Sequence, residues 1–154
     1  MPAKPQILQT KTQQIASIHL TIPRKEIRKV MGPGIQELRA ALAAQGIAPA
    51  GPWFNHHLKM DPNVFDFEIS MPVATPVVAV GRVKPGTLSA ATVARTVYRG
   101  PYEGLGDAWS DLTAWVVAEG HTPAPNLWEC YLVGPESDPD PAVWRTELNR
   151  PLLE

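Results

Sequence analysis

An apolar helical pattern occurs twice in this 154-residue chain, with the same spacing and the same ending. In each copy, apolar residues recur at i, i+4, i+7 and i+11, and a glycine and then a proline follow. The spacing predicts two amphipathic helices whose apolar stripes must be buried, and the glycine and proline predict where each helix ends. The second copy lies 74 residues after the first: Met31, Ile35, Leu38, Leu42, Gly46 and Pro49 correspond to Leu105, Trp109, Leu112, Val116, Gly120 and Pro123.

The segments around the two helices also correspond, and they have the composition of strands. Residues 15–20 match residues 93–98 before the helix, and FDFEISMPV (65–73) matches WRTELNRPL (144–152) after it. In the strand that follows each helix, Asn55 and His57 fall opposite Glu129 and Tyr131. The sequence therefore predicts two copies of a strand–helix–strand–strand (βαββ) module.

A module of this size cannot bury both its helix stripe and its sheet face alone, so we expect the two copies to pack as a pseudo-twofold pair. The predicted fold is α+β, with an antiparallel sheet of about eight strands and both helices on one side. It forms a single domain over residues 7–152, made of repeats at about 7–75 and 88–152. Between them, Val77–Val80 is predicted to be a further edge strand and Val83–Thr87 a turn and linker.

The turns before the helices are predicted from glycine, proline and charge. Gly32–Gly34 and Gly104–Gly106 have no phosphate-loop pattern and are interpreted as turns at the starts of the helices. Arg24–Lys29 is interpreted as an ordinary solvated loop or helix entry in preference to a site for a specific anionic partner.

Composition excludes several classes of protein. The chain is 44% hydrophobic, which suffices for one core, and its 14 basic and 15 acidic residues give a net charge of −1 with no block of like charge. We therefore expect neither nucleic-acid nor membrane binding. The single cysteine, Cys130, excludes an intramolecular disulfide and is predicted to be a small buried side chain. No signal peptide or membrane-spanning run is visible, so a cytoplasmic location is expected.

The strand WECYL contains the most unusual residue for its surroundings, an acid in an apolar segment. A carboxylate at Glu129 must be exposed at an edge, be paired, or be buried for a functional reason, because unpaired burial is costly. A cleft between two similar halves is a usual place for a small-molecule site. The candidate ligand-binding residues are Glu129, Tyr131, Trp109, Trp144, Asn55, His57, Phe65 and Phe67, although for each aromatic residue taken alone a place in the core is the favoured interpretation.

Two other site chemistries lack support in the sequence. His56 and His57 are adjacent strand residues that point to opposite faces, and no cysteine or acid lies at ligand spacing from them, so no metal is expected. No GxSxG motif accompanies the serine, histidine and aspartate residues, so a hydrolase triad has no support. No cofactor is expected either.

The segments RGPYEGLGDAW, AWVVAEG, WECYL and WRTEL, with their earlier counterparts IASIHLTIPR, ALAAQGIAPAGPWF and FDFEISMPV, resemble the GyrI-like small-molecule-binding family, also called the bacterial effector-binding domain. The resemblance covers roughly residues 7–152. It implies a duplicated βαββ fold whose central groove binds lipophilic, often cationic compounds. It also implies that Glu129 matches the buried glutamate of the family's multidrug-responsive regulators, and that an aromatic residue near Trp144 stacks on the ligand.

This implication agrees with the chemistry of the residues. A carboxylate surrounded by tryptophan and tyrosine attracts a delocalised organic cation by charge and by cation–π contact, while apolar walls bury the rings of the ligand. Flat apolar contacts carry little shape information, so such a site tolerates many ligands. Asn55 and His57, opposite Glu129 and Tyr131, would make the groove asymmetric and favour directional binding.

Three functions remain open at this point. Regulators of the family carry a helix-turn-helix domain before the groove domain, whereas this fold begins within the first few residues. We therefore expect a stand-alone binding module, monomeric or homodimeric, whose lipophilic ligand is unspecified. The alternatives are a hydrolase of strained cyclopropane-bearing electrophiles, with Glu129 as general base and Tyr131 holding the substrate, and a protein-interaction role such as gyrase inhibition.

Overall fold

The computed structural model describes residues 4–135 and 137–153, and over these residues the chain forms nine strands and two α-helices. The chain divides into two compact units. Residues 11–90 form the mid-chain unit, and residues 1–10 and 91–154 form the terminal unit. Every strand pairing within each unit is antiparallel, so the predicted α+β class is confirmed.

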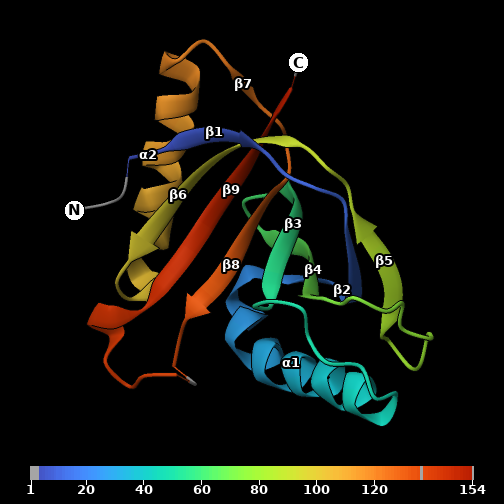
Figure 1. Cartoon of the computed structure of the whole chain (residues 1–154). Coiled ribbons are helices and arrows are strands. Elements are labelled where there is room, and N and C mark those ends of the chain that lie inside the picture. The colour runs from blue at the N-terminus through green and yellow to red at the C-terminus, as the bar shows by residue number, and fades with distance from the viewer. Residues whose placement is uncertain (1–3, 136, 154) are drawn as a thin grey trace. The chain divides into compact units, whose positions relative to one another are not determined.

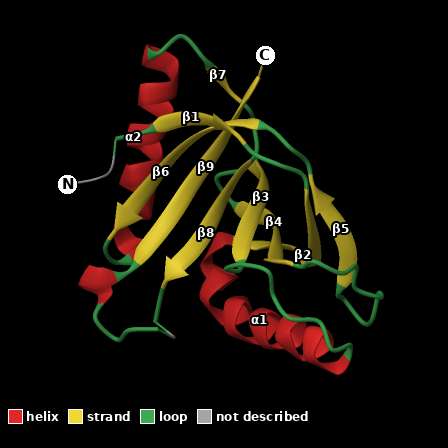
Figure 2. Cartoon of the chain, in the orientation of Figure 1, coloured by secondary structure: helices red, strands yellow, loops and turns green. Residues whose placement is uncertain are grey.

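The mid-chain unit is a four-stranded sheet in the order β3-β4-β2-β5, and one helix packs on it. Helix α1 lies against β2 and β4 (Figure 2). Its stripe, centred on Leu38 and Leu42, is buried against strand residues that include Ile18, Phe67 and Ile69. The elements are β2 (Gln13–Pro23), the 3-10 turn η1 (Arg24–Glu26), α1 (Ile27–Ala44), β3 (Phe54–Met60), β4 (Val64–Pro72) and β5 (Lys84–Leu88).

The terminal unit has the sheet order β1-β6-β9-β8, with the short strand β7 paired to β9. Helix α2 lies against β6 (Figure 1), and Leu112 and Val116 of its stripe are buried with Ala94 and Leu148 of the sheet. The elements are β1 (Gln6–Gln9), β6 (Thr92–Arg99), η2 (Tyr102–Gly104), α2 (Leu105–Ala118), β7 (Thr122–Pro123), β8 (Leu127–Val133), η3 (Pro141–Val143) and β9 (Arg145–Leu153).

Both helices end in the same way. At the end of α1, the N–H groups of Gly46 and Ile47 donate to the carbonyls of Ala43 and Leu42. At the end of α2, the N–H groups of Gly120 and His121 donate to the carbonyls of Val117 and Val116 in the same pattern. Gly46 and Gly120 have φ angles of 68° and 83°, which favour glycine, so each ending is a Schellman motif as the sequence predicted.

The strands after the helices share a second detail. The pairing of β3 with β4 shifts register between His57 and Lys59, and the pairing of β8 with β9 shifts between Tyr131 and Val133. The two irregularities are again 74 residues apart. Each unit contains the order strand, helix, strand, strand, which is what the predicted duplication requires; the duplication itself and the domain limits stay predictions.

The segment between the repeats differs from the prediction. Val77–Val80 is not a strand: the Val77 side chain is buried in the core, and the side chain of Gln45 makes two hydrogen bonds with the backbone of Val78. The strand is instead β5, where a linker was predicted. Pro85 is tolerated there because β5 needs hydrogen bonds only along the side that faces β2.

Helix α1 begins earlier than predicted. Residues 24–29, interpreted as a loop or helix entry, form η1 and the start of α1. The turn predicted at Gly32–Gly34 is wrong, because these residues, with Pro33, lie inside the helix. Proline removes one helical hydrogen bond. The helix continues through it because the apolar stripe extends upstream to Ile27 and Val30, which pack on the core.

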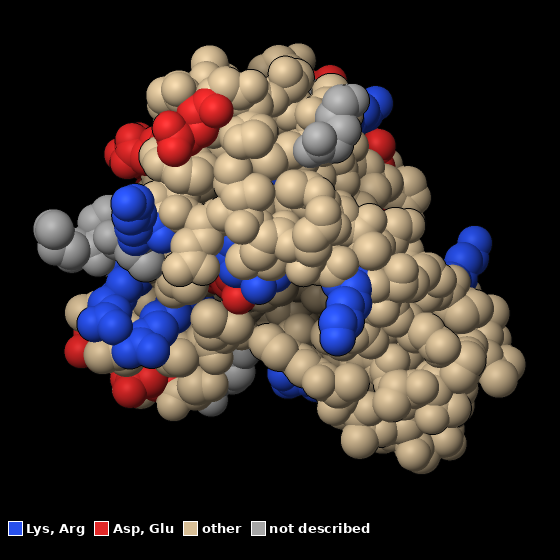
Figure 3. Space-filling view, turned by 45° about the horizontal axis from the view of Figure 1, so that its top comes forward, with Lys and Arg blue, Asp and Glu red and all other residues tan. Residues whose placement is uncertain are grey.

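Charge is distributed unevenly between the units. The mid-chain unit carries nine of the 14 basic residues and five of the 15 acidic ones, so it is basic and the terminal unit is acidic. On the face shown in Figure 3 the charged side chains form separate groups with broad uncharged areas between them. No helix in the described part of the chain has the length and hydropathy needed to span a membrane.

The close approach of α1 to β4 depends on Gly34, because a Cβ atom there would lie 2.5 Å from Cδ1 of Ile69. We predict that Gly34→Ala and Ile69→Val are coupled. Ile69→Val removes the clashing atom, so the double variant should be about 1 kcal/mol more stable than the sum of the single changes. Urea unfolding of the four proteins measures this.

The control is Gly106→Ala, because a Cβ atom at Gly106 meets nothing within 4 Å. Gly106→Ala should add to Ile69→Val within about 0.5 kcal/mol. If the effects of Gly34→Ala and Ile69→Val on the free energy of unfolding were also additive, the contact between residue 34 and Ile69 would not limit how closely α1 packs on β4.

Candidate functional site

Glu129 is on the face of the terminal sheet that carries α2. In the pairing of β8 with β9, Glu129 lies opposite Leu148 and Tyr131 lies opposite Thr146. Leu148 belongs to the core under α2, and directly paired residues of adjacent strands point to the same face. The alternation of β8 therefore directs Glu129 and Tyr131 toward the helix.

Two neutral donors hold the Glu129 carboxylate. The indole Nε1–H of Trp109 donates to Oε1 at 2.7 Å, and the Tyr131 hydroxyl donates to Oε2 at 2.6 Å. The Glu129 residue is 8% exposed, and among the described residues no lysine, arginine or histidine makes an ion pair with it. The structure thus brings together three of the predicted site residues around one buried acid.

Burial raises the pKa of the Glu129 carboxyl above its ordinary value of 4.5. The hydrogen bonds from Tyr131 and Trp109 stabilise the ionised form and act in the opposite direction, but burial is the largest cause. The two neutral donors therefore offset only part of the cost of burying this acid in its ionised form.

Two further aromatic rings lie beside Tyr131. The Tyr102 ring meets the Tyr131 ring edge-on, with centroids 5.9 Å apart, and lies 4.9 Å from the ring centroid of Trp144. The Trp144 indole N–H donates to the carbonyl of Asp138, which fixes the ring to the loop before β9. Both Tyr102 and Trp144 are half-buried, so part of each ring remains accessible.

Tyr102 was not among the predicted site residues. It lies in η2, just before α2, outside the helical stripe and outside the alternating strands. The signal that could have identified it is its place in the first turn before a helix whose apolar face contains Trp109. Trp144 also lies outside the strand predicted for it, since β9 begins at Arg145.

The other predicted residues form a separate cluster in the mid-chain unit. Asn55 and His57 are buried, with 4% and 8% exposure, and they pair with Ile69 and Phe67 across β3 and β4. The His57 ring stacks on Phe67 at 5.5 Å and lies 5.3 Å from the ring centroid of Phe65. Burial, followed by the charges of Arg24 and His56, lowers the pKa of His57 to about 4. This histidine is neutral near pH 7.

The two clusters occupy corresponding positions but have different chemistry. Asn55 and Glu129 each pair with a core residue of the next strand. Each also lies two residues before the point where the strand pairing shifts register, which is His57 in β3 and Tyr131 in β8. The mid-chain position carries a neutral amide where the terminal unit carries an acid. The groove that was predicted to combine these residues stays a prediction.

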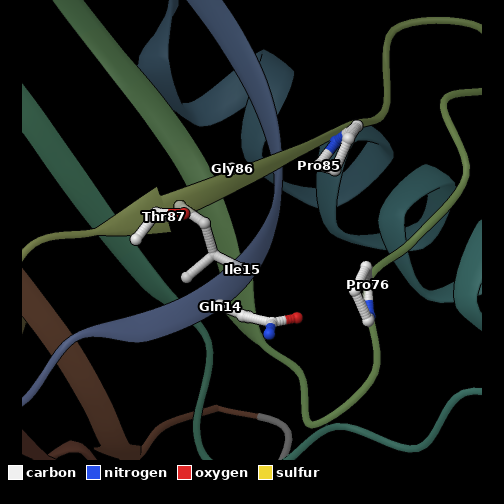
Figure 4. A pocket seen from close by; sticks show the side chains of 6 residues that line it. All are labelled: Gln14, Ile15, Pro76, Pro85, Gly86 and Thr87. Atoms are coloured by element: carbon white, nitrogen blue, oxygen red, sulfur yellow. The ribbon is translucent and has the colours of Figure 1, made fainter.

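A shallow pocket in the mid-chain unit contains none of the predicted residues. Figure 4 shows that it is lined by residues of β2, β5 and the loop before β5: Gln14, Ile15, Pro76, Pro85, Gly86 and Thr87. It holds no charged or nucleophilic side chain. Within the described residues no group of three or more histidine, cysteine, aspartate or glutamate side chains is arranged to bind a metal.

We predict that Glu129→Gln changes the pH dependence of stability. Because burial raises the carboxyl pKa in the folded state, the folded protein binds its proton more tightly than the unfolded chain does. The wild type should therefore lose stability, relative to the variant, as pH rises from about 4.5 through the raised pKa. Urea unfolding at closely spaced pH values measures the difference.

Glu37→Gln is the matched control, with the opposite sign. The hydrogen bonds from Arg82 hold the pKa of Glu37 below its ordinary value. The wild type should gain stability relative to Glu37→Gln as pH rises through that lowered pKa. The same sign for both variants would contradict the assigned effect of burial at Glu129.

Comparison with solved structures shows the same fold in several proteins. The crystal structure of the EcmrR C-terminal domain matches with a TM-score of 0.87 at 21% identity, covering 98% of each chain. In the EcmrR–DNA complex the match has a TM-score of 0.85 at 22% identity, and it covers 98% of this chain and 57% of the EcmrR chain. The chain therefore spans a little over half the length of that relative.

Two more distant structures share the fold. SAV2435 bound to tetraphenylphosphonium matches with a TM-score of 0.65 at 11% identity, over 98% of this chain and 94% of its own. A hydrolase from Listeria innocua matches with a TM-score of 0.69 at 14% identity, over 97% and 92%. None of the curated proteins matches the chain significantly.

The sequence itself matches a family model over nearly its whole length, which confirms the resemblance in the WECYL and GPY segments. The matched region is residues 3–152, and it includes both helices and every strand except the last residue of β9. The chain belongs to the GyrI-like small molecule binding domain family.

Proposed function

We propose that the domain binds lipophilic organic cations, and that Glu129 is the residue that recognises their charge. The observation that carries this proposal is the buried carboxylate whose two oxygens accept hydrogen bonds from neutral donors alone. A buried acid without a cationic partner leaves a negative potential in its surroundings. An organic cation that replaces the missing partner gains this interaction.

The aromatic residues determine which cations fit. Trp109, Tyr131, Tyr102 and Trp144 present ring faces and edges rather than further charges or amides. Small inorganic cations would lose their hydration shells and find too few oxygen ligands in return, since the Glu129 carboxylate and the Tyr131 hydroxyl are surrounded by aromatic rings. A delocalised organic cation is weakly hydrated, and it is stabilised by cation–π contact and by burial of its apolar surface.

The comparisons support this class of ligand. The family is defined by small-molecule binding, and one protein of the same fold, SAV2435, has been solved with tetraphenylphosphonium, a lipophilic cation. The aromatic rings at the site offer flat apolar contacts that carry little shape information, which supports tolerance of ligands that differ in shape. We extend the proposal to several cations of similar size rather than to one substrate.

We predict that Glu129→Gln weakens tetraphenylphosphonium binding by at least about tenfold, because the carboxylate supplies the charge partner. Quenching of tryptophan fluorescence measures the affinity, since Trp109 and Trp144 are at the site. Neutral triphenylphosphine oxide, with similar rings and no net charge, should bind the wild type and the variant equally within about twofold.

Glu119→Gln is the control, because it removes the same charge at the exposed end of α2. It should leave the affinity within about twofold of the wild type. Equal weakening by Glu119→Gln and Glu129→Gln would assign the effect to overall charge and would overturn the role of Glu129.

Hydrolysis is a second candidate, and the raised pKa of Glu129 favours it. A carboxyl group with a raised pKa is a better general base than an ordinary one, and Tyr131 is positioned to hold an electrophile beside it. In the reaction, Glu129 would accept a proton from water while the water oxygen bonds to a carbon of the strained ring. The ring bond that breaks leaves its electron pair on the other ring carbon, which takes up the proton that Glu129 accepted from the water.

Mass spectrometry of the protein with a cyclopropane-bearing electrophile distinguishes the two functions. For a binding protein we expect the compound to be recovered unchanged. A product heavier by one water molecule, formed by the wild type and not by Glu129→Gln, would establish hydrolysis instead.

A further inference from the structure

We propose that the mid-chain unit contains a second ligand site, formed by Arg24, His57 and Phe65, which binds aromatic compounds that carry a carboxylate or sulfonate group. The structural basis is a guanidinium that lies on an aromatic cluster without an acid to pair with. This site uses residues of the mid-chain unit alone, whereas the cation site uses residues of the terminal unit alone.

The aromatic part of the site is built across β3 and β4. His57 lies directly opposite Phe67, with the two rings stacked at 24° to one another. The Phe65 ring meets both, with centroids 5.3 Å from His57 and 6.2 Å from Phe67. Phe67 is fully buried, whereas Phe65 is half-buried. A ligand ring can therefore reach the cluster at Phe65, which the buried His57 and Phe67 rings support from below.

Arg24 supplies the charge. Its Cζ atom lies 4.5 Å from the centroid of the Phe65 ring. The turn between β3 and β4 holds it in place, because Nε donates to the carbonyl of Asp61 at 2.7 Å and the backbone N–H donates to the carbonyl of Asn63. Over the described residues Arg24 makes no ion pair, and its two terminal NH₂ groups donate no hydrogen bond.

A guanidinium in this state is suited to an oxyanion. The two terminal NH₂ groups form a planar fork that can donate to both oxygens of a carboxylate or to two oxygens of a sulfonate. Because Nε and the backbone already fix the side chain, little conformational freedom is lost when an anion binds. The Phe65 ring lies against one face of the guanidinium, so the two terminal NH₂ groups at its outer edge remain for the ligand.

The surrounding charges favour an anion over a cation. Asp61 is the acid close enough to interact with Arg24, but its carboxylate accepts the backbone N–H groups of Asn63 and Val64 instead. Lys59 and His56 are the other charged or titratable groups that interact with Asp61 or His57. The position that corresponds to Glu129 is the neutral Asn55.

The surroundings of His57 indicate the same preference for an anion over a cation. Burial and the positive charge of Arg24 both lower the pKa of its ring, so the surroundings disfavour a positive charge at this position. An organic cation placed against His57 would meet the same penalty. A neutral imidazole stacked between rings gives an aromatic acid an uncharged surface on which to pack.

Binding of 1-naphthalenesulfonate tests the proposal. The wild type should bind it and shift the NMR resonances of the His57 ring, whereas Arg24→Gln should weaken binding about tenfold. Lys25→Gln removes the neighbouring exposed charge and should change the affinity by no more than about twofold. Neutral 1-naphthol should bind the wild type and Arg24→Gln equally.

Arg24→Lys keeps the charge and serves as the second variant, with urea unfolding to check that each variant is folded. It should lose part of the affinity, because an ammonium cannot form the two-pronged contact. Equal losses in Arg24→Gln and Lys25→Gln, or unshifted His57 resonances at saturation, would overturn the site.

The same titrations separate this proposal from the proposed function. Arg24→Gln should leave tetraphenylphosphonium affinity unchanged, and Glu129→Gln should leave sulfonate affinity unchanged. A wild type that binds the cation but not the sulfonate would count against the second site alone, and a wild type that binds the sulfonate but not the cation would count against the cation site alone.

Discussion

The hydrogen bonds from Trp109 and Tyr131 to Glu129 are the interactions on which the chemistry of the terminal unit depends. They link α2 to β8 through a carboxylate that would otherwise be buried without partners. Each bond stabilises the ionised acid, yet together they do not outweigh the cost of burial. The helix is thus attached to the sheet by a group that retains a capacity to bind positive charge. The atoms that attach α2 to β8 are therefore the same atoms to which we assign the proposed binding of a cation.

The mid-chain unit has different side chains at the corresponding buried positions of its sheet. Where the terminal unit has Glu129 and Tyr131, it has Asn55 and His57, and the rings of Phe65 and Phe67 fill the space beside them. An amide and a neutral imidazole can be buried without a counter-ion, so this unit needs no cation. The positively charged Arg24 lies on the ring of Phe65. Corresponding strand positions therefore carry an acid in the terminal unit and a neutral amide in the mid-chain unit.

The two helices show which structural features can be predicted from a local sequence pattern and which cannot. Their apolar stripes and their Schellman endings were both predicted correctly from spacing, glycine and proline, because these signals act within a few residues. The start of α1 was predicted wrongly because Pro33 is locally unfavourable in a helix. Packing of Ile27 and Val30 on the core compensates for the lost hydrogen bond, and that compensation involves residues distant in sequence. The same holds for Gln45 and Val78, whose contact replaces the strand predicted at residues 77–80.

The sequence by itself determined the helix–strand order, the unusual place of Glu129 in an apolar strand and the family to which the chain belongs. Alternation along β8 also determined that Glu129 and Tyr131 share a face, since successive strand residues point in opposite directions. Tertiary structure decided the rest. It placed Trp109 and Tyr131 on the two carboxylate oxygens, added Tyr102, and laid Arg24 on Phe65. These contacts join separate elements, and their geometry depends on how each helix and turn packs on its sheet, which no local pattern encodes.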